Sequence, residues 1–299
     1  MWFLQRWRAV PTVGPDGAAV HAWRVCTVAL LIRPGHAWPL VLAANRDERL
    51  DRAWDPPATH WPGLPDVVAG RDRGGGGTWM GLNAQGVVAA VLNRRGSLGP
   101  AAGKLSRGEL PLRALSHATA ETAARDIGTL DAGKWRSFNL IVADAAGAWF
   151  LRGLGHGQPQ VSPLAPGLHM VTAHDPDDPD SPRVARHLTR FATAVPPRPG
   201  DWRAWQEILA DRSGPPAEQI NVVPQGGFGT VCSALLALPE GGPPVWRFAA
   251  GPPHQTPFRR VRLPWAGRVC GAETALDEGD DRKRHQELAS GITGAGRPC

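Results

Sequence analysis

The sequence predicts an α+β fold in which antiparallel β-sheet packs against helices. Short apolar runs joined by turn residues come early in the chain as two hairpins. Helical patterns follow in the middle, and strand-like runs return towards the end. Strands grouped as hairpins with helices in a separate block are typical of antiparallel sheet, whereas regular alternation of strand and helix would indicate a parallel sheet.

Strands are predicted where short apolar runs are bounded by Gly, Pro, Asn or Asp. These runs lie at residues 25–32, 39–44, 78–83, 87–92, 138–143, 148–151, 168–172, 230–238, 245–249 and 258–263. The first two are separated by Pro34 and Gly35, and the next two by residues 84–86, so each pair is expected to form a hairpin. Residues 50–73 are rich in Pro and Asp and are expected to form a long loop.

Helices are predicted in three segments. Ser106 and Glu109 have the spacing of a capping box, in which two side chains satisfy free backbone N–H groups at a helix start. A helix is therefore expected from residue 110 to about residue 125, with Pro111 in its first turn, where a missing N–H is tolerated. The other helical segments are residues 181–191 and 202–210.

The size of the chain allows one large domain. It has 299 residues, of which 42% are hydrophobic and 20% charged, enough to bury a substantial core. We expect this domain over residues 26–266. Residues 1–25 have no domain character and are interpreted as an extension, while the polar residues 267–299 are expected to be a disordered tail.

Charge and hydropathy exclude two classes of partner. The net charge is +6, but the basic residues come singly or in short groups and never as a long stripe, so we expect no nucleic-acid partner. No run approaches the roughly 18 apolar residues that a membrane helix needs, so no integral membrane segment is expected. The chain has four cysteines and no CxxC pair, which favours a reducing cytoplasm over a disulfide scaffold.

Neither a metal nor a cofactor is expected. The histidines form no metal-ligand pair at helical spacing. Residues 74–77 are four glycines without the Lys-Ser/Thr of a phosphate-binding loop, so a tight turn is expected there. The Asp- and Pro-rich residues 175–180 do not match the spacing of a calcium loop.

Five short motifs follow one another in the order found in a known family. They are the strand opening at Cys26, residues 43–48 (AANRDE), residues 76–83 (GGTWMGLN) running on to Asn93, residues 137–144 (SFNLIVAD) and residues 229–233 (GTVCS). On these motifs the chain resembles the NRDE family, which includes the Transport and Golgi organisation 2 proteins. The resemblance covers about residues 26–265. It implies a four-layer αββα sandwich of two antiparallel sheets, similar to the N-terminal nucleophile hydrolases.

The resemblance makes Cys26 a candidate nucleophile. Family members typically begin Met-Cys, so removal of Met leaves an amino-terminal cysteine whose thiol attacks while its α-amine acts as base. An α-amine with a pKa of roughly 7.7–8.0 suits that role. Here the mechanism requires a chain that starts at Cys26, either by cleavage after Val25 or because Val25 corresponds to a GTG initiation codon, which we favour. A buried strand cysteine is the alternative.

Arg46, Asp47 and Asn93 complete the candidate catalytic set. Four consecutive polar residues from Asn45 to Glu48 cannot all face a core. Similarity to the cholylglycine-hydrolase branch implies that Arg46 and Asp47 orient the nucleophile and that Asn93 helps to form an oxyanion hole. The alternatives are an ion-pair and turn network for the first two and a strand-end cap for Asn93.

The candidate binding residues are Asn45, Glu48, Trp79, Asn83 and His174. His174 could donate a hydrogen bond where the superfamily often has Asn, or simply lie in a loop.

Two functions remain open. One is a cysteine-dependent amidohydrolase or acyltransferase; the other is a non-enzymatic carrier of haem or of acyl-lipid or coenzyme A compounds. The expected partner is thus a small or amphipathic molecule, namely an amide, an acyl compound or haem.

Overall fold

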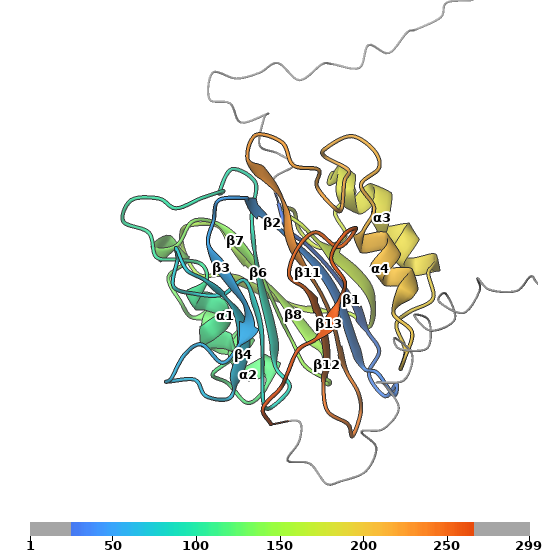
Figure 1. The fold of residues 1–299 in the computed structure, drawn as a ribbon. Helices are drawn as coiled ribbons and strands as arrows, with labels where there is room; N and C mark the ends of the chain where they lie inside the picture. The colour runs from blue at the N-terminus through green and yellow to red at the C-terminus, as the bar shows by residue number, and fades with distance from the viewer. Residues whose placement is uncertain (1–24, 266–299) are drawn as a thin grey trace, which may run out of the picture.

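Two antiparallel sheets lie face to face, with a pair of helices on the outer side of each (Figure 1). This is the arrangement of the computed structural model, which describes residues 25–265. The predicted extension, residues 1–25, falls outside the described residues except for Val25, and the predicted tail, residues 267–299, falls outside them entirely.

The first sheet has six strands and carries the predicted first hairpin at its centre. Its order is β10 (Gly167–Val171), β1 (Thr27–Ile32), β2 (Leu40–Arg49), β11 (Phe228–Leu238), β12 (Val245–Ala249) and β13 (Arg259–Arg260). β1 and β2 pair with Thr27 opposite Asn45, as the hairpin prediction requires. The late strand β11 pairs with the other edge of β2, so β2 lies between β1 and β11 with both edges hydrogen-bonded.

The second sheet has seven strands in sequence order. They are β3 (Trp54–Ala58), β4 (Val67–Asp72), β5 (Met80–Asn83), β6 (Val88–Asn93), β7 (Phe138–Ala143), β8 (Ala148–Gly153) and β9 (Gln160–Leu164). The predicted loop over residues 50–73 is wrong, because β3 and β4 pair within it. Pro56 and Pro57 fit there because β3 is an edge strand, where a missing N–H breaks no ladder. The mostly exposed edge strand β9 had no apolar pattern to reveal it.

Four α-helices cover the outer faces of the sheets. They are α1 (Glu109–Ala114), α2 (Ala120–Gly128), α3 (Pro182–Thr193) and α4 (Arg203–Leu209). The single helix predicted for residues 110–125 is wrong, because the chain breaks after Ala114 and Thr119 caps a second helix by accepting from the Thr122 N–H. Helices α3 and α4 match their predicted segments. Among residues 25–265 no helix is long and apolar enough to cross a membrane.

Three separate apolar clusters confirm the predicted four-layer αββα sandwich. One lies between the two sheets, the second between the seven-stranded sheet and α1 and α2, and the third between the six-stranded sheet and α3 and α4. Alternate residues of β1 feed different clusters: Val28 and Leu30 pack between the sheets, whereas Ala29 and Leu31 face the helices. The strands of the central layers are thus buried on both faces, which explains their nearly continuous apolar sequences.

Candidate active site around Cys26

The predicted polar segment lies at the end of β2, where successive side chains point to opposite faces of the sheet. Arg46 and Glu48 face the space between the sheets, where Arg46 forms an ion pair with a residue of β4. Asn45 and Asp47 face α3 and α4, where Asp47 forms an ion pair with a residue of α3. The four residues therefore belong to two different environments.

A β-bulge in β11 supplies partners for the helix-facing pair. The register of β11 against β2 shifts at Val231. Because the extra residue inverts the alternation, Thr230 and Ser233 both face the helices although they are three positions apart. The Thr230 hydroxyl donates to Asp47 Oδ1 at 2.6 Å, and the Ser233 hydroxyl donates to Asn45 Oδ1 at 2.6 Å.

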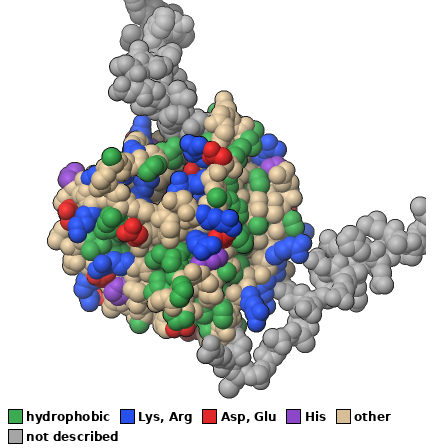
Figure 2. Space-filling model, turned by 60° about the vertical axis from the view of Figure 1, so that its left-hand side comes forward, with side chains coloured by type: hydrophobic (Ala, Val, Ile, Leu, Met, Phe, Trp, Pro, Cys, Tyr) green, Lys and Arg blue, Asp and Glu red, His purple; other side chains and the backbone are tan. Residues whose placement is uncertain are grey.

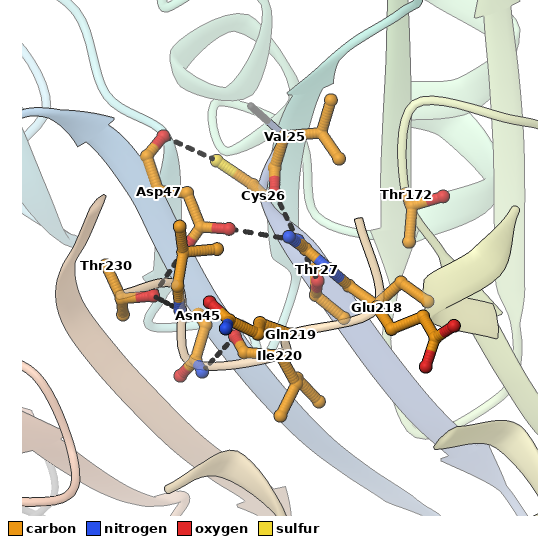
Figure 3. Close-up of polar contacts among 12 residues, drawn as sticks. Val25, Cys26, Thr27, Asn45, Asp47, Thr172, Glu218, Gln219, Ile220 and Thr230 are labelled. Atoms are coloured by element: carbon orange, nitrogen blue, oxygen red, sulfur yellow. Dashed lines mark hydrogen bonds and ion pairs between the residues drawn. The ribbon is translucent and has the colours of Figure 1, made fainter. Parts of the chain in front are cut away.

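Arg183 of α3 organises the helix-facing side of the site. Its Nη1 lies 2.9 Å from Asp47 Oδ2 and 2.8 Å from the Thr27 hydroxyl, and it also donates to the carbonyl oxygen of Val25. Figure 3 labels these three partners. The Arg183 and Asp47 side chains are almost fully buried. Burial raises the pKa of Asp47 to about 6, and the charge of Arg183 and the hydroxyl of Thr230 offset part of that rise. The pair therefore fixes the backbone on the amino side of Cys26.

The Cys26 thiol lies at the junction of the two environments. Its Sγ is 3.7 Å from the carbonyl oxygen of Asp47, and Figure 3 shows the thiol directed towards that atom. Burial, followed by the nearby Asp47 carboxylate, raises the pKa of the thiol to about 12. At neutral pH the thiol is consequently protonated, and it needs a base before it can act as a nucleophile.

Asn45 is fully engaged in holding secondary structure together. Its Nδ2 donates to the carbonyl oxygens of Leu209 at 2.9 Å and Ile220 at 2.8 Å, while its Oδ1 accepts from Ser233. Although Asn45 also borders a crevice beside Cys26, its amide is committed on the opposite face. It ties the end of α4 and the following loop to β2.

Arg46 bridges the two sheets on the other face of β2. Its guanidinium carbon lies 4.4 Å from the ring centre of Trp79, and its Nη2 is 3.2 Å from Asp72 and 3.5 Å from Glu48. The side chain is 4% exposed, yet its Nη1 has no hydrogen-bond partner among residues 25–265. Arg46 thus offers an unused donor in a buried setting.

An open cavity of about 370 Å³ begins at Cys26 and runs between the sheets. Its lining includes Arg46, Trp79, Asn93 and Arg107. The volume falls within the range of small-molecule sites. The Asn93 side chain makes no hydrogen bond with any residue in the described range, so its amide is free to meet a ligand.

Six of the nine predicted site residues line this one cavity. They are Cys26, Arg46, Asp47, Glu48, Trp79 and Asn93. The structure places the other two binding candidates outside the β2 segment elsewhere in the fold. Asn83 closes the β5–β6 turn by accepting from the N–H groups of Gln85 and Val87. His174 contacts Asp178 at 3.2 Å and borders a different cavity. Neither Asn83 nor His174 lines the cavity at Cys26.

Arg183 and Arg107 were missed by reasoning from the sequence. Arg183 meets Asp47 across 136 positions, and no local pattern links the two. Its one sequence signal is its place in the first turn of a helix that begins after Ser181. Arg107 lies within the segment that sequence reasoning used only as a helix cap. Among residues 25–265 no group of three or more His, Cys, Asp or Glu is placed to hold a metal ion.

A family model described as Transport and Golgi organisation 2 matches residues 25–236. That range includes the whole candidate site from Cys26 through Arg183 to Thr230. None of the curated proteins compared with the chain matches it.

Two solved structures share parts of the architecture at low identity. The N-acylethanolamine-hydrolyzing acid amidase ortholog of Caenorhabditis elegans is 13% identical, with a TM-score of 0.47, covering 79% of this chain and 100% of that one. A mutant of the conjugated bile acid hydrolase from Clostridium perfringens is 9% identical, with a TM-score of 0.44, covering 79% of this chain and 96% of that one.

Proposed function

Since the chain belongs to the Transport and Golgi organisation 2 family, we propose that its Cys26 site is that of a cysteine-dependent amidohydrolase or acyltransferase. One observation carries the proposal. The Cys26 thiol opens onto a ligand-sized cavity, while the backbone on its amino side is fixed by the buried Arg183–Asp47 pair. A nucleophile on a rigid support beside a cavity is the arrangement that acyl transfer needs.

The mechanism requires Cys26 to be the first residue of the active chain, because only then is its nitrogen a free amine. With a thiol pKa of about 12, the population of thiolate at neutral pH is negligible. A free α-amine would take the thiol proton as Sγ attacks the carbonyl carbon of an amide or acyl compound. It would then return that proton to the departing amine, alcohol or thiol, leaving an acyl group on Sγ.

Two donors on the cavity side suit the negative charge that develops on the carbonyl oxygen. Among residues 25–265, neither the side-chain amide of Asn93 nor Nη1 of Arg46 has a hydrogen-bond partner. A fixed donor aimed at such an oxyanion typically contributes on the order of 100-fold to 1,000-fold in rate. Water, or an acceptor amine, alcohol or thiol, would then release the acyl group from Cys26.

The direct test compares three chains beginning at Cys26: the parent, Cys26→Ala and Cys232→Ala. Turnover is measured across a panel of medium-chain amides and thioesters. We expect the parent and Cys232→Ala to agree within about threefold, because Cys232 is a buried thiol that packs between the sheets. Cys26→Ala should fall to the uncatalysed rate. Mass spectrometry of protein from the native host should find Cys26 as residue one.

Equal turnover by the parent and Cys26→Ala would reject the proposal, as would an active protein that retains Val25. If every variant binds amphipathic ligands, including haem, but none turns over a substrate, the function is that of a carrier. Titration of haem into the parent, followed by transfer to an apo-haemoprotein, measures that outcome.

A further inference from the structure

Three cationic side chains form one wall of the cavity, and none of them has a carboxylate partner among residues 25–265. They are Lys104, Arg107 and Arg136. Arg107 donates to the carbonyl oxygens of Ser97 at 2.6 Å and Ser137 at 3.1 Å. Arg136 and Lys104 likewise donate to backbone carbonyls of the neighbouring loops. Within residues 25–265, no ion pair therefore neutralises their positive charge.

The other cations of the cavity are already balanced. Arg46 and Arg52 both contact Asp72 and Glu48. Asp47, the remaining acid in the lining, is held by Arg183 on the helix side. An excess of positive charge is thus concentrated at the wall formed by Lys104, Arg107 and Arg136. In Figure 2, Lys and Arg side chains, in blue, gather around a hollow in the upper part of the face shown.

Two features indicate that this charge faces a ligand. Arg107 is largely buried beside Arg136, and burial with that like charge lowers its pKa to about 10, which still leaves it protonated at neutral pH. In the same cavity, Nη1 of the buried Arg46 finds no acceptor in the described part of the chain. An anion would satisfy both needs, since it supplies acceptor oxygens and neutralises adjacent guanidinium groups.

On the basis of the proposed function, we propose that the substrate carries an anionic group, a carboxylate, sulfonate or phosphate, that is bound by Lys104, Arg107 and Arg136. Guanidinium groups are well suited to this because their planar N–H donors match the oxygens of such anions. The site would then select anionic amides or thioesters over neutral ones of the same length. The cavity of about 370 Å³ has room for such a headgroup next to Cys26.

The test uses four amides with one acyl chain and different headgroups: N-octanoylglycine, N-octanoyltaurine, N-octanoyl-phosphoethanolamine and the neutral N-octanoylethanolamine. Binding is measured by calorimetry to the full chain carrying Cys26→Ala, so that no turnover is needed. We expect at least one anionic amide to bind about tenfold or more tightly than the neutral one. The three headgroups identify which anion the wall prefers.

Matched variants test whether the cationic wall causes the preference for anionic over neutral amides. Lys104→Gln with Arg136→Gln keeps hydrogen-bond donors for the loop carbonyls but removes two charges, and should reduce the preference to within about twofold. Lys134→Gln is the control, because this exposed lysine lies in the adjacent 3₁₀ turn but not in the cavity lining. A preference that survives in the double variant, or that disappears in the control, overturns the inference.

A second measurement tests the inference even if the double variant does not fold. The preference of the Cys26→Ala chain for anionic amides should weaken as NaCl rises from about 0.05 to 0.5 M, because salt screens exposed charges. Equal binding of all four amides at low salt overturns the inference. Anion-selective binding without turnover in the parent would instead reject only the hydrolase proposal, so the two failures can be told apart.

Discussion

The two faces of β2 at residues 45–48 both carry polar side chains but use them for different purposes. On the helix-facing side, Asn45 and Asp47 are buried, and both have hydrogen-bond partners fixed at 2.6–2.9 Å. On the cavity side, Arg46 keeps a donor that no residue in the range 25–265 satisfies, and the ion-pair contacts of Glu48 with Arg46 and Arg52 are long, at 3.5 and 3.6 Å. Buried polar groups whose hydrogen bonds are all formed indicate a structural role. A buried donor without a partner indicates a place where a ligand can bind.

On this difference, we propose two roles within the predicted catalytic set. Asp47, through Arg183, positions the amino side of Cys26, whereas Arg46 and Asn93 face the cavity into which a substrate would fit. Changes on the helix side should therefore cost mainly stability. Changes on the cavity side should cost mainly binding and turnover.

The largest stability effect is expected from breaking the buried ion pair. Arg183→Leu leaves Asp47 without its counter-charge, and we expect a loss of about 3–5 kcal/mol in the free energy of unfolding. Arg186→Leu, on the same helix, breaks a partly exposed pair with Glu218 and should cost about 1 kcal/mol or less. Urea denaturation monitored by tryptophan fluorescence measures both. Similar losses in the two variants would contradict the assignment of Arg183 as the support.

A loss of stability of similar size is expected when the pH is lowered, and it arises in the layer formed by α3 and α4. His187 of α3 is buried and donates to the Glu218 carbonyl at 2.8 Å. Burial, with Arg190 nearby, lowers its pKa to about 4. Since the unfolded chain takes up this proton near pH 6.5 and the folded chain does not, the stabilisation is present above pH 6.5 and is lost as pH falls towards 4.

This loss should reach on the order of 3 kcal/mol at pH 4. His187→Gln can keep the donor to the carbonyl but does not titrate, so its unfolding free energy should fall less between pH 7 and pH 4.5 than that of the parent. Urea midpoints at the two pH values provide the comparison. If the unfolding free energies of the parent and His187→Gln fall equally with pH, protonation of His187 is not the cause of the loss.

The smallest expected effect compares the two faces of β2 directly. Asn45→Ala removes the donor to two buried backbone carbonyls and the acceptor of the Ser233 hydroxyl, and should cost about 2 kcal/mol. Glu48→Ala removes an exposed hydrogen bond from the Arg49 N–H and two ion-pair contacts of 3.5 and 3.6 Å, and should cost less than about 1 kcal/mol. Thermal unfolding of both variants gives the ranking. A Glu48 effect that equals or exceeds the Asn45 effect would remove the distinction between the faces.

The sequence by itself determined most of the architecture. Apolar runs bounded by turn residues located the hairpin of β1 and β2 and the strands from β5 to β8, because burial on both faces requires nearly continuous apolar side chains. The family motifs predicted the four layers. Local reasoning failed where the signal was weak, as in the Pro-containing edge strand β3 and the exposed β9, or where Thr119 started a new helix within one apparent helical run.

Only the tertiary structure decided what the polar residues do. Sequence placed Asn45, Arg46, Asp47 and Glu48 together, but the two-residue alternation of a strand sends them to opposite faces. Which face is the support and which the cavity depends on Arg183, which is 136 positions away from Asp47. The sequence thus determined that a polar cluster follows Cys26. The packing of α3 and of the second sheet against β2 determined which members hold Cys26 in place and which line the cavity.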